Sequence, residues 1–213
     1  MNATNNSKQQ LSEIHNLMER SSRFISLSGL SGVSAGVVAL AGALFAYFYL
    51  NFDVRYFDID RYFTQRLYAN FEQKILILLL DAILVLSFAI GSAIFFTTRR
   101  AKQKGLKIWT HSTRLMLYHL FIPLGTGAVF CVILFTYKLI FLLAPVTLIF
   151  YGLALLNASK FTLPEIQWLG ISEIILGLIA ALFVGYGLVF WALGFGILHI
   201  LYGIVMYNRY ERK

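Results

Sequence analysis

Cross-linking and chain-breaking residues are scarce in this sequence. Among 213 residues there are one cysteine, Cys131, and three prolines. A single cysteine excludes an intramolecular disulfide, and it also excludes a metal cluster held by several thiolates. Charge is scarce as well, because Asp, Glu, Lys and Arg make up 13% of the residues, whereas a soluble domain carries about 25%. The chain is therefore too poor in charge for a soluble domain of this length.

Hydrophobic residues take the place of the missing charge, at 59% of the chain. They form several stretches of about 20 residues, the length that one helix needs to cross the hydrocarbon core of a bilayer. We therefore expect an all-α fold, a polytopic transmembrane helical bundle surrounded by the lipid bilayer. The net charge of +8 comes from basic residues in short segments between the apolar stretches, where they set topology and contact anionic lipid. Nucleic acid is not expected as a partner.

Six transmembrane helices are predicted within one membrane domain, residues 26–207. Three of them are expected over residues 26–50, 75–96 and 115–137. A fourth is expected over residues 139–157, and its start stays open because either Lys138 or the segment 143–145, which ends in a proline, suits the turn. Residues 166–207 are long enough for two helices, and Gly185 and Gly187 permit a tight reversal between them.

The distribution of basic residues predicts that both ends of the chain face the cytoplasm, because cytoplasmic segments carry the excess of Lys and Arg. With the N-terminus inside, thirteen of the 18 basic residues lie in inner segments and five in outer ones. Residues 1–25 then form a cytoplasmic segment and residues 208–213 a basic cytoplasmic tail. Leu11, Ile14 and Met18 recur at helical spacing, which predicts an amphipathic juxtamembrane helix. An ordinary extension of the first membrane helix fits the same periodicity.

Small residues line one face of the first predicted membrane helix, including Gly32 and Gly36. A Gly-x-x-x-Gly stripe of this kind lets another helix backbone approach closely. Further glycines that suit close helix packing are Gly177, Gly196 and Gly203. The stripe fits packing within the bundle, which we prefer, and it also fits a dimer interface.

Four ionisable residues lie inside the predicted spans, where charge is costly and polar side chains usually face the bundle interior. They are Asp81, His119, Glu173 and His199. At 1.5 Å per residue from the cytoplasmic ends, His119, Glu173 and His199 lie at depths of about 6, 10 and 12 Å, so we expect one polar cluster. Small residues share the helix faces of Glu173 and His199, which indicates a close helix contact there.

Two interpretations of this cluster stay open. It is a pocket in which Glu173 accepts a proton or a cation that the histidines bind or relay, or it is a hydrogen-bonded clasp that fixes helix packing. We prefer the clasp, because no spacing motif specifies a reaction. A haem held by two histidines is a further alternative, and no other cofactor is predicted. Asp81 is expected to pair with Lys74, Arg66 or Lys138.

Four segments carry a resemblance to a known family. They are residues 17–32 (LMERSSRFISLSGLSG), 157–163 (NASKFTL), 172–177 (SEIILG) and 194–203 (GFGILHILYG). In these segments the chain resembles uncharacterised polytopic inner-membrane proteins of Bacteroidetes-type bacteria. The resemblance implies a location in the bacterial inner membrane and no mechanism.

Motifs that specify catalysis do not occur in the sequence: there is no zinc-protease motif, phosphate-binding glycine loop, nucleophile elbow or Cys-x-x-Cys pair. We therefore expect neither an enzyme nor a metal site. The leading hypothesis is a non-enzymatic packing or interaction module, or a subunit of a membrane assembly, whose partner is another membrane protein or a second copy. The alternative is a small-solute or ion carrier, or its binding subunit, with the site at His119, Glu173 and His199.

Overall fold

The structure, a computed structural model, describes residues 27–50 and 71–212, and in these ranges it contains helices and no strands. The helices are α2 (Gly29–Leu50), α4 (Phe71–Gln103), α5 (His111–Thr136), η2 (Ile140–Leu142), α6 (Leu143–Ala158), η3 (Ser159–Phe161), α7 (Pro164–Leu182), α8 (Gly187–Trp191), the π-helix η4 (Ala192–Leu198) and α9 (His199–Tyr210). Within these ranges, six helical spans are long and apolar enough to cross a membrane. The predicted all-α bundle of six spans is confirmed. The predicted amphipathic segment of residues 1–25 lies outside the described residues.

The helix boundaries differ from the predictions mainly in α4, which runs over 33 residues and continues well past residue 96. Arg99, Arg100 and Lys102 extend it, because backbone hydrogen bonds continue a helix beyond the lipid as readily as within it. The turn between α5 and η2 falls at Lys138, which takes a φ of 61°. Pro145 instead lies in the first turn of α6, where its missing N–H costs no helical hydrogen bond.

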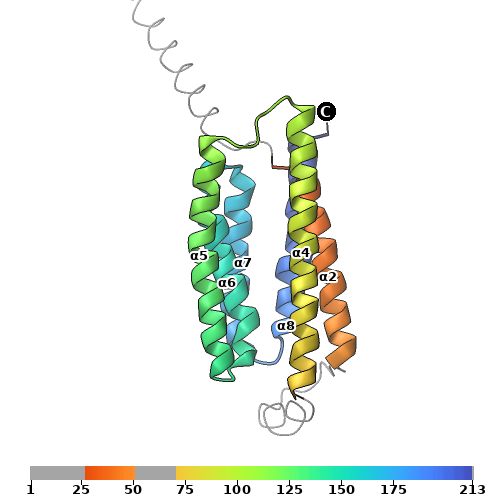
Figure 1. The fold of residues 1–213 in the computed structure, drawn as a ribbon, viewed down its shortest axis with the longest axis vertical. Helices are drawn as coiled ribbons and strands as arrows, with labels where there is room; N and C mark the ends of the chain where they lie inside the picture. Colours follow the sequence, from red (N-terminus) through yellow and green to blue (C-terminus); the bar gives the residue numbers. More distant parts are fainter. Residues whose placement is uncertain (1–26, 51–70, 213) are drawn as a thin grey trace, which may run out of the picture.

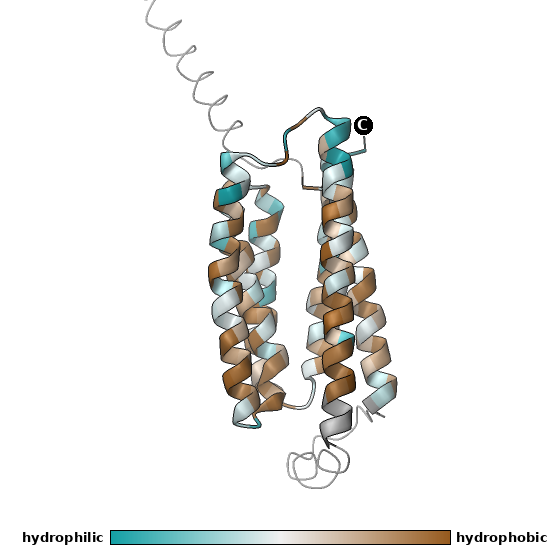
Figure 2. Ribbon diagram, in the orientation of Figure 1, coloured by the Kyte–Doolittle hydropathy of each residue, from teal (hydrophilic) through white to brown (hydrophobic). Residues whose placement is uncertain are grey.

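The helices form two groups of three spans (Figure 1). α5, α6 and α7 make one group, and α2, α4 and the continuous span α8–η4–α9 make the other. The span α8–η4–α9 also contacts α6 and α7, so it joins the two groups. Leu27 before α2, the last turn of α4 and Glu211 after α9 meet at one end of the bundle, which we call the terminal end. Figure 2 shows hydrophilic residues at the terminal ends of α4 and α5 and mostly apolar ones along the helices.

Backbone contact through glycines holds α2 against η4 and α9. A Cβ atom added to Gly36 would lie 2.6 Å from the carbonyl oxygen of Gly196, and one added to Gly203 would lie 2.7 Å from the carbonyl oxygen of Gly29. A Cβ on Gly32 would lie 3.2 Å from the Cα of Gly203. Distances this short leave no room for a side chain, so the stripe of small residues on α2 lies in an interface within the bundle.

The contact between α6 and α7 is built in the same way. A Cβ atom on Gly170 would lie 2.8 Å from the carbonyl oxygen of Gly152, and one on Gly177 would lie 2.9 Å from the carbonyl oxygen of Pro145. Because both helix pairs are so closely packed, side chains between them have little freedom to move away from one another. The polar residues of the bundle interior lie among these contacts.

Candidate polar site in the bundle interior

Glu173 and His199 meet between α7 and α9. The Glu173 side chain is 0% exposed and that of His199 is 8% exposed, and the imidazole Nδ1 lies 3.4 Å from the carboxylate Oε1. Tyr151 of α6 completes the group, because its hydroxyl lies 2.8 Å from the imidazole Nε2. Three spans therefore contribute one polar side chain each to a buried group, which we call the polar site.

The π-helix η4 supplies a backbone partner for His199. His199 directly follows the π-helix, and its side chain reaches back to Gly194, five residues earlier in the chain. The imidazole Nδ1 lies 3.0 Å from the Gly194 carbonyl oxygen. Since a carbonyl oxygen only accepts, Nδ1 carries the hydrogen, and Nε2 then accepts from the Tyr151 hydroxyl. Both ring nitrogens of His199 are satisfied in this way.

Glu173 is not satisfied, since neither carboxylate oxygen has a hydrogen-bond partner among the described residues. The 3.4 Å separation from His199 exceeds the usual 2.7–3.2 Å of an N–H···O bond, and the Nδ1 hydrogen already points to Gly194. The carboxylate instead lies against apolar atoms: a Cβ on Gly194 would be 2.5 Å from Oε2 and would also overlap Leu148. Gly194 is thus the residue whose small size allows the carboxylate to lie there.

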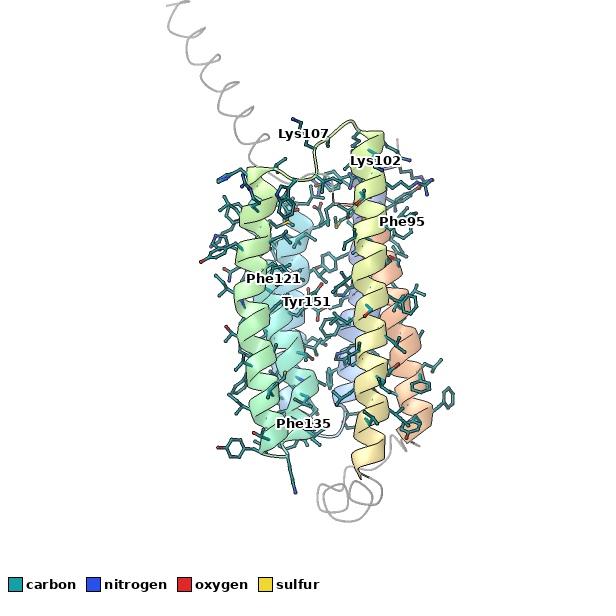
Figure 3. The ribbon with its side chains drawn as sticks, viewed as in Figure 1. Phe95, Lys102, Lys107, Phe121, Phe135 and Tyr151 are labelled. Carbon is teal, nitrogen blue, oxygen red and sulfur yellow. The ribbon has the colours of Figure 1, made fainter. Side chains whose placement is uncertain are left out.

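Aromatic rings cover the other side of the polar site. The ring centroid of Phe195 lies 4.9 Å from that of Tyr151 and 5.9 Å from that of His199, and Trp191 lies 4.9 Å from Phe195. Tyr151, labelled in Figure 3, thus reaches from α6 to η4 and α9. The aromatic rings and the polar site together form the contact between the two groups of helices.

His119, the third residue expected in the cluster, is not brought to it. Its ring stacks on Phe161 of η3 with 4.9 Å between centroids, and it makes an edge contact with Tyr118. The helix that carries it, α5, packs against α6 and η3. Similar depth along the bundle axis did not bring it to Glu173, because depth does not determine which helices are neighbours.

Asp81 of α4 faces α2. A Cβ added to Gly42 would lie 3.4 Å from the nearer Asp81 carboxylate oxygen and would overlap the side chain of Val85. Two of its expected partners, Arg66 and Lys74, have side chains outside the described part of the chain. The pairing of Asp81 therefore stays a prediction.

A polar network lies at the terminal end, where the sequence predicts only a basic tail over residues 208–213. Glu165, in the first turn of α7, accepts a hydrogen bond of 2.8 Å from Arg209. The hydroxyl of Tyr210 lies 3.1 Å from each Glu165 carboxylate oxygen, so its one hydrogen is shared between them. An acidic residue in the first turn also interacts favourably with the helix dipole. The proline followed by Glu165 was the available signal, since proline favours the first helical position.

Glu211, which follows Tyr210 in the chain, binds the other group of helices. Its carboxylate accepts a 3.0 Å hydrogen bond from the hydroxyl of Ser28 and another from the backbone N–H of Gly29, so it caps the N-terminus of α2. Arg100 of α4 pairs with Glu211 at 3.3 Å and donates to the carbonyl oxygen of Leu27. Consecutive residues after Asn208 thus connect α7 of one group with α2 and α4 of the other.

The side chains near the polar site give little support to binding of a metal ion or a haem. No group of three His, Cys, Asp or Glu residues able to hold a metal ion occurs in the part of the chain that the structure describes. Both nitrogens of His199 have partners, and His119 lies against Phe161. A haem bound by both histidines would require these contacts to break.

Fold and site together define a polytopic helical integral membrane protein with a buried polar site at a three-helix contact. Comparison of the chain with protein-family models, with curated proteins and with solved structures finds no match.

Proposed function

We propose that this chain is a small-solute or ion carrier, or the binding subunit of one, with its site at Glu173, His199 and Tyr151. The observation that supports this is the carboxylate of Glu173, which is fully buried and has no hydrogen-bond partner among the described residues. A clasp that served packing alone would satisfy this group, because an unsatisfied buried polar group costs about 1–3 kcal/mol. Buried groups left in this condition in membrane proteins commonly belong to ion or substrate pathways.

The position of the site supports the same function. It lies where α6 and α7 of one group of helices meet α9 of the other, and relative movement of such groups about a central site is how many carriers expose it alternately to each side. Bound ligand at Glu173 would change the contact between the groups directly. Ligand binding at the polar site is thus coupled to the arrangement of the two groups of helices.

We also propose a bacterial inner-membrane location with both ends of the chain in the cytoplasm. The excess of basic residues in the inner segments supports the orientation, and the resemblance to Bacteroidetes-type inner-membrane proteins supports the compartment. Reporter enzymes fused after Lys104 and after Lys213 are expected to be cytoplasmic, and one placed in residues 51–70 is expected to be external. An external reporter after Lys213 would contradict the orientation.

The function is tested by thermal-shift screening of the purified protein in lipid nanodiscs against inorganic cations, amino acids and organic acids. A ligand at 100 times its Kd stabilises the folded protein by about 2.7 kcal/mol. We expect a ligand that stabilises the wild type and the matched variant Asp81→Asn, which removes another carboxylate within the spans. The same ligand is expected to leave Glu173→Gln unshifted. A shift that survives in Glu173→Gln would contradict the proposed site.

A second candidate, a non-enzymatic packing or interaction module, is favoured by α4. This helix packs along α2, apart from polar contacts of its last turn and the residues after it, and it leaves large apolar side chains such as Leu84 and Phe88 exposed. Another membrane protein or a second copy fits such a face, as does lipid. Native mass spectrometry from nanodiscs distinguishes the two candidate functions. An interaction module is expected to retain a protein partner or a second copy, whereas a carrier acting alone is expected to be a monomer.

A further inference from the structure

We infer that the ligand of Glu173 is a proton, and that binding of this proton decides whether His199 donates to Gly194 or to Glu173. The inference rests on the proposed function, because it names the chemical class of the ligand at the same site. Every part of it is present in the structure: a fully buried carboxylate without a partner, an imidazole N–H within 3.4 Å, and a second acceptor at 3.0 Å.

A metal cation does not fit the site. Hard cations such as Ca²⁺ and Mg²⁺ take six or more oxygen ligands, whereas no group of three His, Cys, Asp or Glu residues able to hold a metal ion occurs among the described residues. The carbonyl oxygen of Gly194 already accepts from His199. One carboxylate oxygen lies against Gly194, where an added Cβ would be only 2.5 Å away, so that side leaves no room for a coordination shell. A proton needs no shell, since it is held by a single O–H bond.

Two states follow from the geometry. With the proton bound, Glu173 is neutral, and the Nδ1 hydrogen of His199 remains on the Gly194 carbonyl at 3.0 Å, as the structure has it. When the O–H bond breaks and the proton leaves to water as hydronium, the carboxylate gains a negative charge. Hydrogen bonds to charged acceptors are about twice as strong as neutral ones, so the Nδ1 hydrogen moves to Oε1, which is already 3.4 Å away.

Tyr151 keeps the histidine in the form that this exchange requires. Its hydroxyl donates to Nε2 in both states, so the hydrogen of the neutral ring stays on Nδ1. Two titratable side chains lie at Glu173 on the helices packed around it, His199 of α9 and Tyr151 of α6, which is bonded to His199. The described segments α8 and η4 contain no titratable side chain. A change in the charge of Glu173 therefore acts first on His199.

The exchange has a consequence for the backbone. When His199 turns to Glu173, the Gly194 carbonyl loses its side-chain partner inside η4, and π-helical turns are rare and occur frequently at functional sites. Because η4 lies between α8 and α9 and contacts α2 and α7, a change there reaches both groups of helices. Proton binding is in this way linked to their arrangement.

Infrared difference spectroscopy of the full chain in lipid nanodiscs tests the inference with the proton as the only ligand. Spectra recorded over a pH series are expected to contain the C=O stretch of a protonated carboxylic acid that disappears as pH rises. Uniform ¹³C labelling of glutamate should shift this band in the unmodified protein, so the assignment to glutamate does not depend on a variant that folds. The band should be absent in Glu173→Gln and present in Asp81→Asn.

A second readout follows His199. The ¹⁵N resonance of its Nδ1 is expected to change over the same pH interval as the band, and to be independent of pH in Glu173→Gln. The inference is overturned if no glutamate band titrates while the protein stays folded, or if the band persists in Glu173→Gln. Failure of the ligand screen beside a titrating Glu173 band would refute a small-solute site and leave the proton site, and with it an ion carrier, standing. A stabilising metal ion that requires Glu173 would instead overturn the inference and support the proposed carrier.

Discussion

Gly194→Ala is the substitution that most directly tests the placement of Glu173. The added methyl group would lie 2.5 Å from the Glu173 carboxylate and would also overlap Leu148, so the carboxylate or the helix η4 must shift. Inserting a methyl group into a close-packed interior typically costs about 1–3 kcal/mol. We therefore expect the free energy of unfolding to fall by about that amount, less the gain of up to about 1 kcal/mol that alanine brings over glycine in a helix.

Gly91→Ala is the matched control, because a Cβ atom at Gly91 of α4 has nothing within 4 Å. This variant should be as stable as the wild type or more stable by up to about 1 kcal/mol. Equilibrium unfolding in mixed micelles measures both variants, and the double variant Gly194→Ala with Glu173→Ala should recover part of the loss because one of the two overlaps is gone. Equal stability of Gly194→Ala and Gly91→Ala would refute the close contact.

Three further predictions concern stability measured in the same way. Glu173→Leu should leave the free energy of unfolding unchanged or raise it, because the carboxylate has no hydrogen bond to lose. A loss of about 1–3 kcal/mol would instead indicate that Glu173 belongs to a hydrogen-bonded clasp that fixes helix packing. Tyr210→Phe removes the shared hydrogen bond from the hydroxyl to the Glu165 carboxylate and should cost about 1.5 kcal/mol. Arg209→Ala should cost less than about 1 kcal/mol, because the Arg209 side chain is 65% exposed; the reverse order would contradict this account. Glu211→Ala should cost about 3 kcal/mol, because it leaves the buried guanidinium of α4 without its carboxylate, and an unchanged stability would show that the pair does not hold the terminal end.

The number of spans was predictable from sequence because a bilayer requires a fixed length of apolar helix. The length of α4 was not predictable, because hydropathy identifies only the apolar part of a helix. The helix α4 continues beyond that part, through the polar residues Arg99 to Gln103. The hairpin between α7 and α8 was predictable from Gly185, which takes a φ of 97°. Lys138 at a φ of 61° carries no such signal, because a lysine in a turn resembles any exposed lysine.

The polar site was predictable in part. Small residues beside Glu173 and His199 indicated a close contact, and the structure has one there. His119 has a similar depth, but the neighbours of α5 are set by tertiary packing that no local pattern reports. Tyr151 was missed because a tyrosine in an apolar run resembles a membrane-interface residue. The π-helix was missed because one extra residue in a turn leaves no distinct periodicity.

The network at the terminal end also imposes an order on biosynthesis. Arg100 and Glu165 leave the ribosome long before Arg209, Tyr210 and Glu211, which are their partners in the finished bundle. Closure of the terminal end therefore has to wait until α9 and Glu211 have been synthesised, and until then Arg100 and Glu165 lack these partners. During that interval the two groups of helices can adjust to one another, and the contacts of Arg209, Tyr210 and Glu211 then fix the result.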